Sequence, residues 1–466
     1  MIDALKNIFN VPDLRKRVFY TLGLLAVYRV GGHIYVPGVN AAALTRWFST
    51  QGGNLFGMFD LFAGGNFKKF TIFALGIMPY ISASIILQLL TVIWPYLEKL
   101  SKEGEVGRKK ITQYTRYGTV LLSVVQSLGI AFWLQKAVSP QVGVPIAPDG
   151  WGFRLMTVLT LTTGTAFIMW LGEQISERGI GNGISLIIYA GIIVGLPNAI
   201  LSTWTQISDG QLNPIGLVAL LGLMSGVIAG IVLVERAQRK IPIQYARRVV
   251  GRRVYGGAST YLPLRVNTGG VIPVIFASSI LAIPQTLLQL GAFQQYRFFQ
   301  VFHQQIEYSM PFYNLLYFAM IIFFCFFYTS IIFNPMDTAD NMKKYGGFIP
   351  GIRPGKRTAE YIDRILTRIT FGGAIYLGII SLLPVFLISG LRLHLLWPPA
   401  VGNFFDRILP VDFIKEGLNV RFYFGGTSLL IVVGVAMDTV QQIEAQLIMR
   451  HYEGFLKGTR IRGRRG

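Results

Sequence analysis

Cysteine is almost absent from this chain of 466 residues, which contains only Cys325. One thiol cannot form an internal disulfide, and it cannot supply the several thiolates of a structural zinc or iron–sulfur site. Acidic residues are also few, with 22 Asp and Glu against 43 Lys and Arg, so the formal net charge is +21. This excess predicts anionic partners, such as lipid headgroups, RNA or an acidic protein surface.

Residues suited to catalysis are equally sparse. The four histidines form no pair with the spacing of metal ligands: His33, His303, His394 and His451. Neither a GxxxxGK[ST] phosphate loop nor a GxGxxG fingerprint occurs, and the glycine cluster at 179–183 is typical of a helix start. We therefore predict that the protein is not an enzyme and that it uses no cofactor.

Long apolar stretches, by contrast, fill the chain. Hydrophobic residues make up 52% of it and the mean hydropathy is +0.50. Most stretches have roughly the 20 residues that a helix needs to cross a bilayer. The ten predicted spans are 18–36, 70–95, 117–135, 155–172, 184–207, 213–234, 269–291, 311–333, 371–391 and 424–443. We predict an all-α polytopic membrane protein with no large soluble domain.

The basic residues divide unequally between the two sides of such a membrane protein. With the N-terminus inside, the inside segments hold 32 Lys and Arg and the outside loops 10, with Arg29 inside the first span. The positive-inside rule favours this orientation, which also places the C-terminus inside. Because five is an odd number, two halves of five spans have opposite orientations, an arrangement common in transport proteins.

Two inside loops are long and basic, at about 235–268 and 334–370. Their Arg, Gly and Pro content predicts ordered protrusions, and residues 245–255 have the β-branched and aromatic pattern of a hairpin around Gly251. The long outside loop at 392–423 has no assigned role.

Ionisable groups are nearly missing from the span interiors, where ion-coupled transporters place them. Arg29 and Asp438 are the exceptions, and each fits a snorkelling or paired structural charge. A secondary transporter for a polar solute is weakened but stays open, because uncharged polar groups also bind solutes.

Residues 53–70 are apolar and aromatic but are interrupted by Asp60 and glycines. They fit either an interfacial aromatic loop or a re-entrant element held against protein or water. The isoleucine pairs Ile81/Ile85 and Ile188/Ile192 have helical i,i+4 spacing. They fit either ordinary packing or an apolar constriction that seals a pore by dewetting.

Several long blocks of sequence are more specific. LGIMPYISASIILQLLTVIWP (75–95) closely resembles the second span of the SecY protein-translocation channel family, and five further blocks in the same order resemble it too. They are 103–117, 170–185, 269–280, 333–354 and 422–431. The resemblance is nearer to the bacterial members than to the archaeal or eukaryotic ones.

This resemblance implies ten helices in two inverted five-helix halves around an hourglass pore, with a re-entrant plug helix. The halves would be 1–207, with the plug at about 53–70, and 208–449, followed by a basic cytosolic tail at 450–466. The implied pore ring consists of Ile81, Ile85, Ile188, Ile192, Ile275 and Ile431. The implied plug residues are Phe59, Leu61, Phe62, Gly64 and Gly65, and the implied lateral gate is lined by Ser82, Ser84, Gln88, Ser278 and Ser279.

The resemblance also implies a function and partners. The chain would be the central pore subunit that passes unfolded secretory polypeptides across the bacterial inner membrane and releases transmembrane segments into lipid. Its expected partners are the small subunits SecE and SecG, the SecA ATPase, the ribosome with its rRNA and proteins, precursor polypeptides and anionic lipids. Docking is expected at Arg247, Arg248, Arg252, Arg253, Arg353, Lys356 and Arg357. The alternatives are a secondary transporter and a structural membrane scaffold, of which the scaffold does not account for the re-entrant segment.

Overall fold

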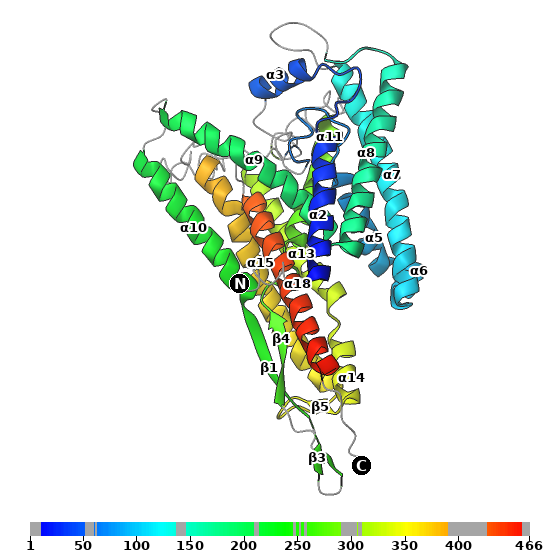
Figure 1. The fold of residues 1–466 in the computed structure, drawn as a ribbon, viewed down its shortest axis with the longest axis vertical. Helices are drawn as coiled ribbons and strands as arrows, with labels where there is room; N and C mark the ends of the chain where they lie inside the picture. The colour runs from blue at the N-terminus through cyan, green and yellow to red at the C-terminus, as the bar shows by residue number, and fades with distance from the viewer. Residues whose placement is uncertain are drawn as a thin grey trace. The chain divides into compact units, whose positions relative to one another are not determined.

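The computed structural model describes residues 11–51, 60, 63–136, 146–208, 214–245, 248–250, 253–255, 259–289, 305, 310–389 and 426–458. The N-terminal helices are α2 (Pro12–Gly31), α3 (Ala41–Gln51), α5 (Met78–Ile93), α6 (Pro95–Lys102), α7 (Glu105–Lys136), α8 (Trp151–Arg178) and α9 (Gly183–Ser208). The later helices are α10 (Pro214–Arg236), α11 (Ile272–Gln289), α13 (Pro311–Ile332), α14 (Pro335–Lys344), α15 (Lys356–Ser389) and α18 (Gly426–Gly458). Figure 1 shows these helices and the strands β1 (Gln238–Tyr245), β2 (Arg248–Val250), β3 (Arg253–Tyr255), β4 (Ser259–Arg265) and β5 (Gly347–Phe348).

Each of the ten predicted spans overlaps one helix of the structure. Within the described residues, six helices are long and apolar enough to cross a membrane, or seven if the bent pair α5–α6 is one span. The prediction of a helical, multi-pass membrane protein is therefore confirmed. Cys325 lies buried in α13, as expected for a packing residue.

The predicted span 70–95 is too long at its N-terminal end. Helix α5 begins at Met78, because Gly76 has a φ of 56°, which no right-handed helix contains, and Pro79 occupies the first turn. The helix ends at Ile93, since Pro95 favours an extended conformation at Trp94. Helix α6 then leaves at 99° to α5.

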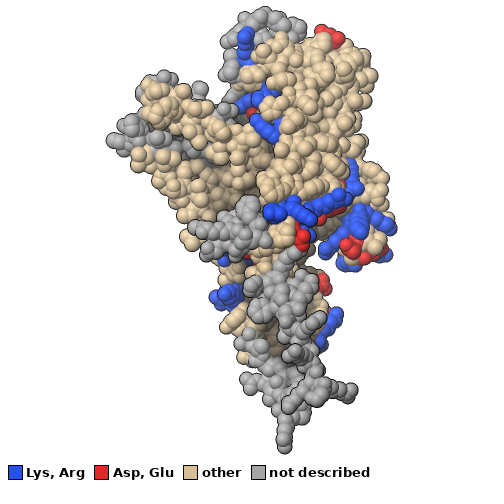
Figure 2. Space-filling view, in the orientation of Figure 1, with Lys and Arg blue, Asp and Glu red and all other residues tan. Residues whose placement is uncertain are grey.

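Helix α6 is amphipathic and lies across the direction of α5. Leu97 and Leu100 are buried, whereas Lys99 and Lys102 are exposed. Gly104, with a φ of 76°, then turns the chain into α7. Figure 2 shows Lys and Arg gathered around α6 and the start of α7, next to the largely uncharged surface of α7 and α8. A charge boundary of this kind is typical of the edge of a membrane-embedded region.

The chain divides into two compact units. Unit 1 comprises Met1–Leu201, Thr286–Tyr296 and Val435–Gly466, and unit 2 comprises Ser202–Gln285 and Arg297–Gly434. In unit 1, α7 packs against both α5 and α8, and in unit 2, α13 packs against α15. Helix α18 contributes its first residues to unit 2 and the remainder to unit 1.

Unit 2 carries the protrusion that was predicted at 235–268. Strands β1 and β4 form a long antiparallel ribbon from Gln238↔Arg265 to Gln244↔Ser259, and β5 pairs with the end of β1. Ile241, Ile243 and Leu264 form the buried face of this ribbon. They pack with Met342 of α14 and Ile362 of α15, so the two long basic loops form one folded body.

At the end of the ribbon, β2 pairs with β3, with Val249 opposite Val254. This pairing confirms the hairpin predicted at 245–255. The turn itself lies outside the described residues, as does the outside loop at 392–423.

Candidate pore, plug and gate

The first pair of predicted pore residues lies on one face of α5. Ile81 and Ile85 are 4% and 1% exposed, whereas the neighbouring Ile86 is 42% exposed. Ile81 and Ile85 are one helical turn apart, so a single buried face presents both. Helix α5 thus has a buried aliphatic face with Ile81 and Ile85 and a second aliphatic face that is exposed.

The second pair lies near the beginning of α9. Asn182 caps this helix, because its Oδ1 accepts a hydrogen bond of 3.1 Å from the backbone N–H of Ile184. The hydroxyl of Ser176 accepts from Gly183 N at 2.9 Å. These bonds hold the start of α9 against the end of α8, and they place Ile188 and Ile192 inside the protein, at 1% and 0% exposure.

The remaining two pore positions belong to unit 2. Ile275 of α11 and Ile431 of α18 are 5% and 0% exposed. Close to them, Gly434 of α18 packs against Val271, and a Cβ at position 434 would collide with the Val271 side chain unless that side chain moved. All six isoleucines are therefore interior side chains, and their convergence into one ring stays a prediction.

Four of the five predicted gate residues form hydrogen bonds within their own helices. Ser278 and Ser279 of α11 both donate to the carbonyl oxygen of Ile275, each at 2.8 Å. In α5, Gln88 Nε2 donates to Ser84 Oγ at 3.2 Å, and Ser82 is buried. A hydrogen bond inside one helix is kept when that helix moves away from a neighbour, so a seam lined by these residues separates without losing those bonds.

The described plug residues belong to a compact segment, which we call the plug turn: Asp60 together with residues 63–71. The carboxylate of Asp60 accepts from Lys68 N at 3.0 Å and pairs with Lys68 Nζ at 3.3 Å. Its backbone oxygen accepts from Gly65 N at 2.8 Å. Of the predicted plug residues, Gly64 and Gly65 lie in this turn, and Phe59, Leu61 and Phe62 lie outside the described residues.

The plug turn touches α9 beside the pore positions. Gly64 has a φ of 68°, and a Cβ added to it would lie 2.6 Å from the Cα of Gly191. Only two facing glycines allow the backbones to approach this closely. Gly191 directly precedes Ile192, so the turn and the second isoleucine pair are neighbours.

The basic docking residues lie on the protrusion of unit 2. Arg353 is exposed in the connection from β5 to α15, and Lys356 and Arg357 are exposed in the first turn of α15. The N-terminal end of a helix is positive and disfavours nearby cations, and this turn contains no acidic residue to offset them. Its charges therefore do not serve helix stability, and they suit an external anionic partner. In the hairpin, Arg248 and Arg253 lie in β2 and β3, whereas Arg247 and Arg252 fall outside the described residues.

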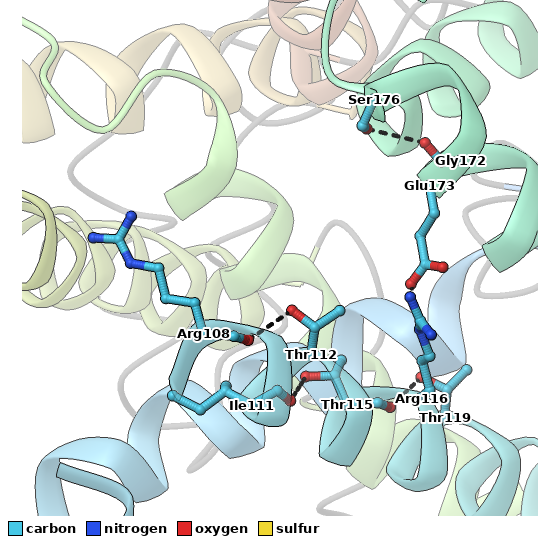
Figure 3. Close-up of polar contacts among 9 residues, drawn as sticks. All are labelled: Arg108, Ile111, Thr112, Thr115, Arg116, Thr119, Gly172, Glu173 and Ser176. Atoms are coloured by element: carbon cyan, nitrogen blue, oxygen red, sulfur yellow. Dashed lines mark hydrogen bonds and ion pairs between the residues drawn. The ribbon is translucent and has the colours of Figure 1, made fainter. Parts of the chain in front are cut away.

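An ion pair joins α7 to α8 near the basic end of unit 1. Figure 3 shows Arg116 and Glu173 pointing toward one another, with Nε and Oε1 at 2.8 Å. The surrounding hydroxyls bond back to their own helices: Thr112 to Arg108 O, Thr115 to Ile111 O, Thr119 to Thr115 O and Ser176 to Gly172 O. Arg116 and Glu173 thus connect the two helices, while the hydroxyls do not.

The SecY family model matches residues 71–440, which include all the predicted pore and gate residues described above and both basic loops. This chain belongs to the SecY family. It is 45% identical over 459 residues to the protein translocase subunit SecY of Aquifex aeolicus, covering 98% of this chain and 100% of that protein. It is 47% identical over 455 residues to the same subunit of Escherichia coli strain K12, covering 97% and 96% respectively.

Solved structures show the same SecY fold. A protein-conducting channel matches with a TM-score of 0.59 at 17% identity, covering 93% of this chain and 92% of that one. Sec61 in a canine ribosome–channel complex matches with a TM-score of 0.54 at 16% identity, covering 93% and 92%. The predicted SecY resemblance and fold class are therefore confirmed. The prediction that the chain is not an enzyme agrees with relatives that are named as translocase subunits.

Sequence reasoning missed the residues that hold the plug turn. Tyr28, whose hydroxyl bonds to Ala63 O and Asn66 Nδ2 of this turn, was not predicted as a site residue, and neither was the pairing of Asp60 with Lys68. One signal was available, since a carboxylate and an ammonium eight positions apart in an otherwise apolar segment favour a turn that brings them together.

Proposed function

We propose that this SecY-family chain is the central pore subunit of a protein-conducting channel. It passes unfolded secretory polypeptides across the membrane and releases transmembrane segments sideways into lipid. The observation that carries the proposal is its identity of 45–47%, over nearly the whole chain, to relatives named protein translocase subunit SecY.

The residues suit this task chemically. Buried isoleucines seal a path without binding ions, because an aliphatic constriction excludes water, and they move aside for a polypeptide of any sequence. The plug turn lies next to two of these positions and adds a second closure on the closed channel. The gate hydroxyls bond within their helices, so opening toward lipid breaks few hydrogen bonds.

Energy for transport comes from partners, because the chain has no recognisable nucleotide site of its own. We assign docking of the SecA motor and of ribosomal RNA and proteins to the basic protrusion with Arg353, Lys356 and Arg357. SecE and SecG would complete the membrane complex, and anionic lipids would contact the basic inside segments. The excess of inside Lys and Arg, 32 against 10, supports an orientation with both termini in the cytoplasm. The relatives from Aquifex aeolicus and Escherichia coli support placement in a bacterial inner membrane.

Reconstitution tests the function directly. The chain would be incorporated into vesicles with SecE and SecG, and SecA, ATP and a secretory precursor would be added. We expect the precursor to become protected from protease inside the vesicles. Saturable and stereospecific uptake of a small solute, without precursor protection, would instead identify a transporter.

Arg353→Glu tests the docking surface. The residue is exposed, so the substitution should leave folding and insertion near normal, while charge repulsion replaces attraction at the protrusion. We expect SecA-driven export to fall by roughly tenfold or more, because like charges brought together at an interface cost several kcal/mol. Lys344→Glu, an exposed charge at the end of α14, is the matched control. Export at the wild-type rate in the Arg353 variant would remove Arg353 from the docking surface.

A further inference from the structure

The plug turn is held from the side of α2 by a buried polar network. The hydroxyl of Tyr28 donates to the carbonyl oxygen of Ala63 at 3.2 Å and accepts from Asn66 Nδ2 at 3.2 Å. Asn66 Nδ2 also donates to Ala63 O at 2.6 Å. Tyr28 and Asn66 are 4% and 2% exposed, so these hydrogen bonds are shielded from water. We call Tyr28, Ala63 and Asn66 the plug anchor.

The plug anchor and α9 hold opposite sides of the same turn. Ala63 and Asn66 bracket the two glycines of the turn, and Gly64 is the residue that faces Gly191 of α9. A Cβ added to Gly64 would also lie 3.1 Å from the Tyr28 hydroxyl, so one residue touches both helices. The ring of Tyr28 is itself fixed by stacking on Phe73, with centroids 5.7 Å apart.

We propose that Tyr28 and Asn66 are plug-positioning residues, which keep the turn against α9 beside Ile188 and Ile192 and so keep the resting channel closed to ions. The inference rests on the proposed channel function. A polar anchor suits a closure that must be released, because hydrogen bonds hold one geometry and lose their strength over a short displacement. Buried bonds of this kind also have no competing water while the turn is seated.

The anchor can be tested with a one-atom change. Tyr28→Phe removes the hydroxyl and two of the three hydrogen bonds, while Asn66 Nδ2 keeps its bond to Ala63 and the ring keeps its stacking partner. Tyr20→Phe is the matched control, because Tyr20 lies on the same helix and its hydroxyl donates to Gln174 Oε1, away from the plug turn. Both variants would be purified with SecE and SecG and reconstituted without precursor.

We expect Tyr28→Phe to raise resting ion conductance by about tenfold, the shift that loss of one or two net hydrogen bonds produces. Tyr20→Phe should stay at the wild-type level. In a protein that also lacks residues 60–70, Tyr28→Phe should add nothing, because the group it positions is gone. The Tyr28 variant should further export a precursor with a weakened signal sequence better than wild type does, which a purely structural defect would not cause.

The proposed role of the plug anchor would be overturned if Tyr28→Phe had wild-type conductance, or if conductance rose equally in both tyrosine variants. A rise that persists without residues 60–70 would overturn it too. If Tyr28→Phe does not insert, Asn66→Ala takes the same test with the same expected result. The channel function itself is tested separately, by whether the wild-type chain protects a precursor from protease. Failure of that test would count against the channel function, whereas the ratio of variant to wild-type conductance tests only the plug anchor.

Discussion

The predicted pore positions on α9 and the plug turn lie side by side in unit 1 but are built from opposite chemistry. Ile188 and Ile192 offer only aliphatic groups, whereas the plug turn is fixed by hydrogen bonds and by the Asp60–Lys68 ion pair. Apolar contact has no preferred direction, so it closes around whatever passes. Hydrogen bonds prefer one geometry, so they return a moving segment to one place. The difference fits the proposal that the isoleucines seal the channel and that the polar contacts hold the plug turn in place.

The largest effect on this contrast is expected when a polar side chain replaces one of the isoleucines that we propose as the seal. Ile85→Asn buries an amide at a position that is 1% exposed, which costs about 2 kcal/mol in the closed state unless the amide finds hydrogen bonds. Conductance of reconstituted vesicles should rise by roughly 30-fold, in line with about 1.4 kcal/mol per factor of ten. Ile86→Asn on the exposed face is the control and should leak little. Equal leakage in the two variants would exclude Ile85 from the seal.

A smaller effect is expected where the plug turn loses its buried carboxylate. Asp60→Ala removes an acceptor that is bonded to Lys68 N, and the lower end of the range for such charged hydrogen bonds is about 1.5 kcal/mol. We expect resting conductance to rise by about tenfold. Lys68→Met keeps the backbone N–H and removes an ammonium whose side chain is 45% exposed, so its effect should be about 1 kcal/mol or less. Asp60→Ala loses both the ion pair and the backbone acceptor, whereas Lys68→Met loses only the ion pair, so equal leakage in the two variants would show that the ion pair and not the acceptor holds the turn.

The smallest effect is expected from an aliphatic change in the seal. Ile85→Val removes one methylene and should lower stability by about 1 kcal/mol. Because valine also excludes water, conductance should stay within about threefold of wild type. Thermal unfolding and conductance would be measured on the same preparation. A leak as large as that of Ile85→Asn would show that the seal depends on exact fit and not on apolar character.

Much of the fold was predictable because its signals are local. Each of the ten apolar stretches overlaps a helix, and β2 and β3 form the expected hairpin with Val249 opposite Val254. Where the prediction was wrong, at the beginning of α5, the deciding features were a glycine with positive φ and a proline in the first turn. Hydropathy does not register either feature, since it averages over about 20 residues.

The candidate site was predictable only in part. The isoleucines and serines could be placed because long blocks of sequence resemble the SecY family, and the structure shows that all six isoleucines are buried. The fused body of the two basic loops was not predictable, because the contact of β1 with β5 joins residues about 100 positions apart. Its core of Ile243, Met342 and Ile362 depends on that long-range pairing.

The sequence by itself determined that the chain is a helical multi-pass membrane protein, because the length and charge of each apolar stretch decide whether it can cross a bilayer. The tertiary structure decided which polar groups hold the interior. Tyr28 and Asn66 are 38 positions apart, and Gly64 meets Gly191 on another helix. A buried polar group is stable only where packing brings a hydrogen-bond partner next to it. The positions of the two groups in the sequence do not show that they will be in contact.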